Sequence, residues 1–106
     1  MSFAISVRRQ DAFTALLLTG ELDMATAPHL GEHVDDLLSG GHPRIVVDLH
    51  DLTFCDSSGL NAFVQGDRRC TAEGGWLRVT RPRGHVARVL ELSGVAEVLA
   101  YSGDEA

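Results

Sequence analysis

Apolar residues recur along this chain with two different periods, and the two periods alternate. Strand-like runs, alternating or continuously apolar, occupy residues 3–8, 13–18, 44–49 and 76–80. Helical spacing of apolar residues appears in 28–38, 57–73 and 86–92. A last apolar stretch, residues 95–101, predicts a short final strand. The predicted order is therefore β-β-α-β-α-β-α, followed by that short strand.

The pattern also indicates how the strands are arranged. A short polar link, Arg9–Asp11, favours an antiparallel hairpin between the first two strands. Residues 44–49 alternate little, which is typical of a central strand buried on both faces. Each later β-α-β step needs a right-handed crossover to a parallel strand. We predict an α/β fold in one domain, residues 1–106, with a mixed sheet of about four to five strands and three or four helices. The polar tail, residues 102–106, is expected to fray.

The polar segment Asp51–Leu60 follows the central strand and leads into the second helix. We expect Asp56 to cap that helix, because its carboxylate can accept hydrogen bonds from the backbone N–H groups of the first turn. Ser57 and Ser58 fall within that turn, where the partial positive charge of the helix favours an anion such as a phosphoryl group. On local chemistry alone, a plain cap is the commoner interpretation of Asp-Ser-Ser.

A helical wheel separates the two hydroxyl groups by direction. Ser58 lies on the polar side with Asn61 and Gln65, and it is therefore predicted to face solvent. Gly59 lies on the side that faces the sheet, where a small residue allows close packing. Ser57 projects elsewhere and is the better candidate for a local structural role.

Charge and hydropathy exclude several classes of function. The net charge is −6, and the 9 basic residues include no Lys, so direct binding to nucleic acid is not expected. An acidic surface suits a protein partner with a basic face. The apolar runs are too short to span a bilayer, and the N-terminus does not resemble a signal peptide. We therefore expect a cytoplasmic protein without membrane insertion.

Signatures of catalysis and of cofactor binding are missing from the sequence. It contains no Gly-x-Ser-x-Gly, no Gly-x-x-x-x-Gly-Lys-Ser/Thr loop and no Gly-x-Gly-x-x-Gly after a strand. His29 and His33 lie four residues apart on a predicted helix, but a protein metal site usually needs three or four ligands. We therefore expect no catalytic residues, no cofactor and no metal.

Other residues near the strand ends allow two interpretations each. Asp23, Asp48, Asp51 and Asp56 could together bind Mg²⁺, although caps and turns account for most such residues. Cys55 could be a reactive thiol, although free Cys is more often a small buried residue. In both cases the structural interpretation is favoured.

Taken together, the stretches above resemble the STAS domain family, and within it the small single-domain anti-sigma factor antagonists. The resemblance rests on Gly20-Glu21-Leu22-Asp23 with Thr26 and Leu30, on Val47-Asp48-Leu49 through Asp56-Ser57-Ser58-Gly59-Leu60, and on Leu77 to Val95. It covers nearly the whole chain. One departure is Asn61, where these proteins often carry Gly, and this changes the surface beside the serine.

The resemblance implies a STAS-like fold and a partner-switching mechanism. The unphosphorylated antagonist binds an anti-sigma factor, which is also an ATP-dependent serine kinase, and so releases a sigma factor. The kinase phosphorylates the second serine, here Ser58, with Ser57 the less favoured acceptor, and a protein phosphatase reverses the step. The expected partner-binding residues are Asp23, Asp56, Ser57, Ser58, Gly59, Asn61 and Gln65.

Two other functions compete with this one. STAS-like domains also serve as scaffold or accessory subunits, in signalling complexes or beside transporters, without control by phosphorylation. A module that binds a small ligand or a nucleotide through the N-terminus of the second helix is the other alternative.

Overall fold

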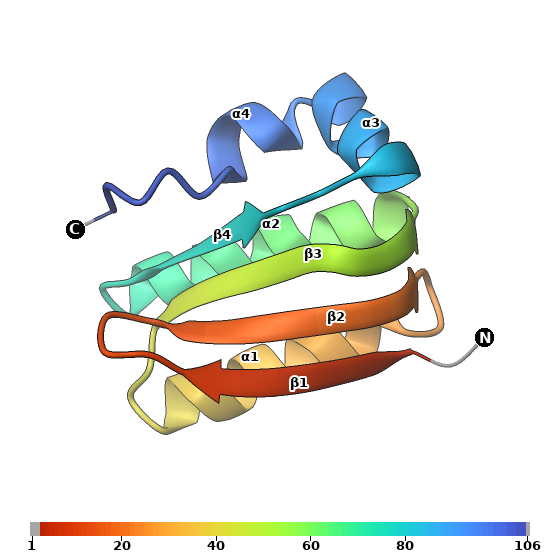
Figure 1. Ribbon diagram of the computed structural model, residues 1–106. Helices are drawn as coiled ribbons and strands as arrows, with labels where there is room; N and C mark the ends of the chain where they lie inside the picture. Colours follow the sequence, from red (N-terminus) through yellow and green to blue (C-terminus); the bar gives the residue numbers. More distant parts are fainter. Residues whose placement is uncertain (1–2, 106) are drawn as a thin grey trace.

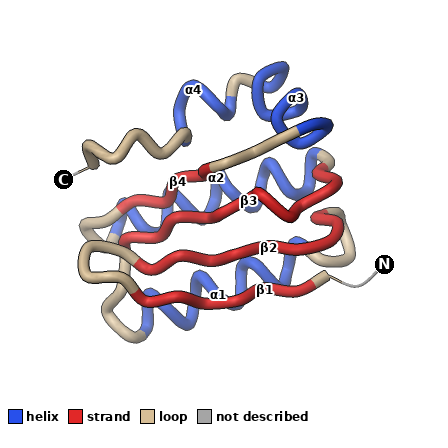
Figure 2. Tube along the Cα trace, in the orientation of Figure 1, coloured by secondary structure: helices blue, strands red, loops and turns tan. Residues whose placement is uncertain are grey.

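A computed structural model describes residues 3–105, and its elements follow the order β-β-α-β-α-β-α-α (Figures 1 and 2). The strands are β1 (Ala4–Arg9), β2 (Thr14–Leu22), β3 (Arg44–Cys55) and β4 (Trp76–Thr80). The helices are α1 (Ala27–Ser39), α2 (Ser57–Ala72), α3 (Gly84–Ser93) and α4 (Val95–Leu99). No helix in this described range is long and apolar enough to cross a membrane. The predicted α/β class is confirmed.

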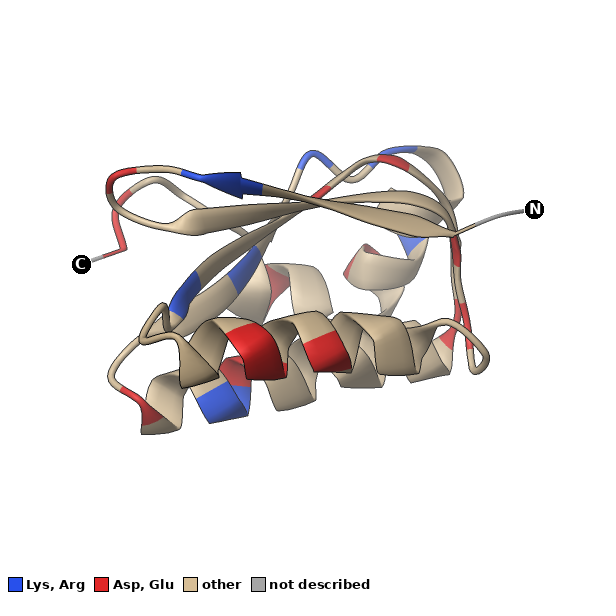
Figure 3. Ribbon diagram, turned by 90° about the horizontal axis from the view of Figure 1, so that it is seen from below, with Lys and Arg blue, Asp and Glu red and all other residues tan. Residues whose placement is uncertain are grey.

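The sheet is mixed, as predicted, and its spatial order is β1-β2-β3-β4. β1 pairs antiparallel with β2, while β2 with β3 and β3 with β4 are parallel, so β3 has a neighbour on each side. Both parallel crossovers step in the same direction across the sheet. Successive right-handed crossovers of this kind place their helices on one face, and α1 and α2 lie together below the sheet in Figure 3.

The core lies between the sheet and these two helices. Alternate residues of β2 and β3 point toward the helices, and a stripe on each helix meets them. The fully buried side chains of this layer include Leu16, Leu18, Ile45, Val47, Leu49, Leu30 and Phe63. Burial of this kind stabilises the fold by about 1.5–3 kcal/mol for each large apolar side chain. α3 and α4 contact β3, β4 and α2, and so cover the β4 side of the sheet.

The prediction of a final strand over residues 95–101 is wrong, because most of that stretch forms α4. Gly94 ends α3 with φ 83°, a conformation that favours glycine, and it turns the chain into a new helix. The spacing of Val95, Val98 and Leu99 suits one helical turn as well as it suits a strand. Ala100 forms an isolated bridge with Val79, so pairing with the sheet is limited to one residue there.

β2 and β3 are both longer than the sequence pattern indicated. β3 continues to Cys55, and so includes residues 51–55 of the polar segment that we expected to follow the strand. Register shifts on β2, between Leu17 and Thr19 and between Gly20 and Glu21, accommodate the irregular stretch. The turn before α2 is therefore reduced to Asp56, and the end of β3 holds it directly.

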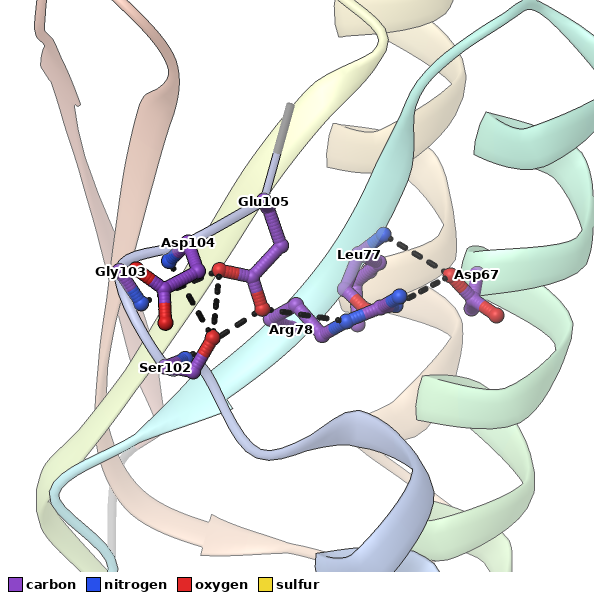
Figure 4. Close-up of polar contacts among 7 residues, drawn as sticks. All are labelled: Asp67, Leu77, Arg78, Ser102, Gly103, Asp104 and Glu105. Carbon is purple, nitrogen blue, oxygen red and sulfur yellow. Dashed lines mark hydrogen bonds and ion pairs between the residues drawn. The ribbon is translucent and has the colours of Figure 1, made fainter.

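The polar tail does not fray over the residues that the structure describes. Glu105 accepts hydrogen bonds from Ser102 Oγ at 3.2 Å and from the Gly103 backbone N–H at 3.1 Å (Figure 4). Burial alone would raise the pKa of Glu105, but hydrogen bonds from this turn hold it below its usual value. Arg78 Nε lies 3.5 Å from Glu105 Oε2, which links the tail to β4. Because Arg78 lies far from the tail in sequence, the polar composition of the tail alone could not predict that it is held in place.

The same network closes the outer edge of β4. Asp67 of α2 accepts the Leu77 backbone N–H at 3.0 Å and also pairs with Arg78 Nη1 at 2.9 Å (Figure 4). The Tyr101 N–H donates to the Val79 carbonyl at 2.8 Å. These groups of an edge strand would otherwise be free to pair with another chain.

Candidate functional site

Asp56 begins α2 and caps it, as predicted. Its Oδ1 accepts the backbone N–H of Ser58 at 2.9 Å and that of Gly59 at 3.2 Å. The carboxylate also lies at the positive end of the helix, where a negative charge is stabilised. The Asp56 backbone N–H donates to the Leu22 carbonyl at 3.3 Å, which ties the turn to the end of β2. Asp56 therefore fixes where α2 starts relative to the sheet.

Gly59 allows this end of α2 to pack directly against the sheet. A Cβ at Gly59 would lie 2.7 Å from Sγ of Cys55 and 2.9 Å from Cδ2 of Leu22, closer than ordinary contact. The prediction that Gly59 faces the sheet is confirmed. Its inclusion among the partner-binding residues is corrected, because Gly59 is buried and the sheet covers it.

A hollow of about 320 Å³ lies between α1 and α2. We call it the α1–α2 hollow. One wall comes from α2 and the other from α1 and the turn before it. The lining residues are Ser58, Asn61, Ala62, Gln65 and Arg69 from α2, and Met24, Ala27, Pro28 and Gly31 from the opposite wall. The structure thus brings together Ser58, Asn61 and Gln65, as the wheel predicted.

The exposure of the two serines differs from the prediction. Ser58 is half-buried in the α1–α2 hollow, whereas Ser57 is exposed to solvent. A helical wheel describes one helix and contains nothing of α1, which packs along the flank that the wheel assigned to solvent. The hydrogen bonds of this turn come from Asp56 and the backbone, so the structural role expected of Ser57 is absent among the described residues.

Asp23 shapes the turn that leads into α1. Its Oδ1 accepts the backbone N–H groups of Ala25 at 3.0 Å and Thr26 at 3.1 Å, and Thr26 Oγ1 bonds back to the Glu21 carbonyl at 2.8 Å. This turn presents Met24, whose side chain is 78% exposed at the rim of the hollow. Sequence reasoning missed Met24, although a large apolar residue outside the stripe of the first helix was the available signal.

An ion pair closes the far end of the α1–α2 hollow. Arg69 Nη2 pairs with Asp35 Oδ1 of α1. Arg69 lies eleven residues after Ser58 in the same helix, about 16 Å along the axis at ~1.5 Å per residue. Arg69 lines the same hollow as Ser58, but its charge is already compensated by Asp35, so it offers little to an anion placed on Ser58.

The four carboxylates near the strand ends have separate local roles. Asp23 and Asp56 form the turns described above, and Asp51 pairs with His50 at 3.0 Å. Burial alone would raise the pKa of Asp48, but hydrogen bonds from Arg81 and the His50 backbone, together with the charge of Arg81, hold it below its usual value. Over residues 3–105, no group of three or more His, Cys, Asp or Glu side chains could hold a metal ion.

Cys55 is a buried packing residue at the end of β3. The Cys55 side chain is 1% exposed, and its Sγ lies directly against Gly59 of α2. Burial, with a smaller contribution from the charge of Asp56, raises the pKa of the Cys55 thiol to about 11. Cys70 is similarly buried, and burial raises its pKa to about 11 as well. A thiol with such a pKa is almost entirely protonated near neutral pH, so it is a poor nucleophile.

Native protein is accordingly expected to resist thiol reagents. At pH 7.5, DTNB should react with neither cysteine on the time scale of minutes, whereas both should react at once in denaturant. Stopped-flow absorbance measures the two rates, and a surface variant, Ser57→Cys, provides a reactive control in the same turn. Rapid native labelling of Cys55 would contradict its assignment as a packing residue.

Comparisons with known proteins identify the family of the chain. Residues 5–100 match the family described as "Mlab, STAS domain". The anti-sigma-B factor antagonist of Staphylococcus aureus (strain NCTC 8325 / PS 47) is 27% identical over 99 residues, which cover 93% of this chain and 92% of that protein.

Solved structures give the same result. The crystal structure of an anti-sigma factor antagonist from Mycobacterium paratuberculosis has a TM-score of 0.80 at 27% identity, covering 92% of this chain and 83% of that one. The anti-sigma factor antagonist SpoIIAA in its unphosphorylated form shares the fold, with a TM-score of 0.77 at 23% identity over 89% of this chain and 84% of that one. The chain belongs to the STAS domain family.

Proposed function

We propose that this protein is an anti-sigma factor antagonist whose unphosphorylated form binds an anti-sigma factor through the α1–α2 hollow. The observation that supports this most is the position of Ser58, half-buried in a hollow at the capped start of α2. The hollow combines an exposed apolar rim, Met24, with the polar wall of Asn61 and Gln65. Relatives of similar length are named anti-sigma-B factor antagonists.

We further propose that phosphorylation of Ser58 by the anti-sigma factor switches this binding off. A phosphoryl group adds about −1.5 to −2 charges at neutral pH. On Ser58 it would occupy the hollow that the partner needs, near Asp56, and the arginine of that hollow, Arg69, is already paired with Asp35. Both the added volume and the uncompensated charge would oppose association. A protein phosphatase would restore the binding form.

The proposal predicts where a phosphate is transferred. With the cognate anti-sigma factor and ATP, the chain should gain one phosphate, and mass spectrometry of the digest should map it to Ser58. Ser58→Ala should abolish the transfer, while Ser57→Ala, a change at the exposed neighbour, should preserve it. A phosphate found outside both serines would refute the switch.

Absence of any transfer, combined with stable binding to a signalling or transporter complex, would favour the alternative of a STAS scaffold subunit. Binding of a nucleotide at the start of α2, detected through amide shifts of residues 57–61, would instead favour a ligand-binding module that uses the helix N-terminus.

A further inference from the structure

The outer edge of β1 carries backbone groups that point away from the sheet. β1 lies at one side of the sheet, with β2 as its neighbour (Figure 1). The Gln10 N–H donates to the Phe13 carbonyl at 2.9 Å, and hydrogen-bonded pairs alternate along an antiparallel ladder. The even-numbered residues of β1 therefore direct their backbone groups toward β2. The odd-numbered residues direct theirs outward, and these are Ile5, Val7 and Arg9.

An exposed apolar side chain accompanies these outward backbone groups. Val7 is 47% exposed, and its register with the buried Leu16 places it on the helix-covered face of the sheet. Ile5, opposite Leu18, lies on the same face and is half-buried. Among the residues that the structure describes, no segment other than β2 bonds to the backbone of β1 in a ladder or turn. The edge of β1 is therefore available to a further strand.

The charges of β1 indicate which strand fits this edge. Arg8 and Arg9 lie together at the end of the strand, and the residues before them, Ala4 to Val7, are uncharged. A second copy of β1 in the parallel direction would set arginine beside arginine, and like charges directly opposite each other are destabilising. In the antiparallel direction the uncharged half of each strand faces the arginines of the other. β1 is therefore complementary to an antiparallel copy of itself.

The outward backbone groups also select one register. Odd-numbered residues must oppose odd-numbered residues, because only their N–H and C=O groups reach the second copy. With Ile5 opposite Val7 of the second copy, residues 3–9 of both chains pair through about eight backbone hydrogen bonds, two for each outward pair. A shift by two residues in either direction loses one such pair within the described chain. The shift toward the arginines also brings Arg8 diagonally beside Arg8 of the second copy.

We propose that two copies of this chain form a weak symmetric dimer through antiparallel pairing of their β1 strands, with Ile5 opposite Val7 of the second copy. The four strands of each copy then form one continuous sheet, with both pairs of core helices on the same face. β1 contributes no residue to the α1–α2 hollow, so the dimer does not depend on the partner switch. A strand pair of this length buries less area than a standard interface, so we expect a dissociation constant on the order of 100 μM.

Sedimentation equilibrium and amide hydrogen exchange of the intact chain test this proposal together. Between about 10 μM and 1 mM, the mean mass should rise from that of one chain toward twice that value. The amides of Ser6 and Arg8 bond to β2 and should be protected from exchange at both concentrations. The outward amides of Ile5 and Val7 should exchange about fivefold more slowly at the higher concentration, because about a fifth of the chains then remain free.

Two substitutions on β1 test the register. Val7→Pro removes an outward N–H without removing a bond to β2, and it should weaken the dimer more than about tenfold. Ala4→Glu places a carboxylate opposite Arg8 of the second copy, on the open face of the sheet, and should tighten the dimer about fivefold. Ala4→Gln, which has the same size without the charge, is the matched control and should stay within about twofold of the unchanged chain. The gain expected from Ala4→Glu keeps the test decisive even if Val7→Pro does not fold.

Three results would overturn the proposed dimer. The mass could remain that of one chain at about 1 mM. The mass could double while the amides of Ile5 and Val7 exchange as fast as in the dilute protein, which would place the contact elsewhere. Ala4→Glu could associate no more tightly than Ala4→Gln, which would exclude the proposed register. Protection of those two amides only after a peptide of different sequence is added would assign the edge to another partner and would equally overturn pairing with a second copy.

Discussion

Ser58→Asp should bind the anti-sigma factor about a hundredfold more weakly than Ser58→Ala, which should bind constitutively. Ser58 is half-buried in the α1–α2 hollow, so a carboxylate there would be desolvated when a partner covers it. The neighbouring charge of Asp56 has the same sign, and Arg69 is already paired with Asp35. A cost of about 2.7 kcal/mol is enough for a hundredfold change in the association constant. Isothermal titration calorimetry with the purified partner measures both variants.

Two controls separate charge from size and from position. Ser58→Asn has nearly the shape of Ser58→Asp without the charge, and it should retain most of the affinity. Ser57→Asp places the same charge on the exposed neighbour, where the helix N-terminus stabilises it, and should change binding by only a fewfold. Equal binding by Ser58→Asp and Ser58→Ala would rule out charge at Ser58 as the control. An equal loss of partner affinity in Ser58→Asp and Ser57→Asp would show that the position of the charge inside the hollow does not determine binding.

Gly75→Ala should produce the largest loss of stability among single methyl additions to the glycines. Gly75 begins the approach to β4, and a Cβ there would overlap the carbonyl group of Pro43 and lie 2.7 Å from its Cβ. The obstacle is backbone, and the same carbonyl accepts the Trp76 N–H at 3.0 Å, so relief requires β3 and β4 to separate where they begin. We expect a loss of about 3 kcal/mol or more in the free energy of unfolding. Urea denaturation monitored by circular dichroism measures it.

Gly31→Ala is the matched control, because it adds the same methyl group at a helical site where nothing lies within 4 Å. Replacing glycine inside α1 should raise stability by about 0.5–1 kcal/mol through helix propensity. The two variants are therefore expected to differ in sign. A Gly75→Ala protein within about 1 kcal/mol of the unchanged chain would contradict the close approach of Pro43 to this turn.

The sequence pattern predicted the helices of the core because each carries a stripe of apolar residues and ends at glycine or proline. It predicted the cap at Asp56 for the same local reason. It did not predict the full length of β3, since His50 and Asp51 interrupt the apolar run, and the register shifts that accommodate them involve the facing strand. α4 was missed because five residues satisfy either period and the φ of Gly94 decides between them.

Only half of the candidate site was visible in the sequence. The wall formed by Ser58, Asn61 and Gln65 follows from the periodicity of a single helix. The opposite wall, with Met24 and Pro28, depends on which face of the sheet receives α1 and how closely the helices approach. Those quantities arise from strand order and crossover direction, which no single helix encodes. The half-buried position of Ser58 therefore appears only in three dimensions.

The backbone groups of the two edge strands differ in whether they already have hydrogen-bond partners, and this limits how the protein can polymerise. At β4 the Leu77 N–H and the Val79 carbonyl are already bonded, and Arg78 and Glu105 hold the tail close by. β1 has a strand neighbour on one side only, β2, and within the described chain no other segment bonds to its outer backbone groups in this way. Fibre growth by strand addition needs two open edges in every molecule. With β4 closed, association through β1 ends at a pair and cannot propagate into a filament.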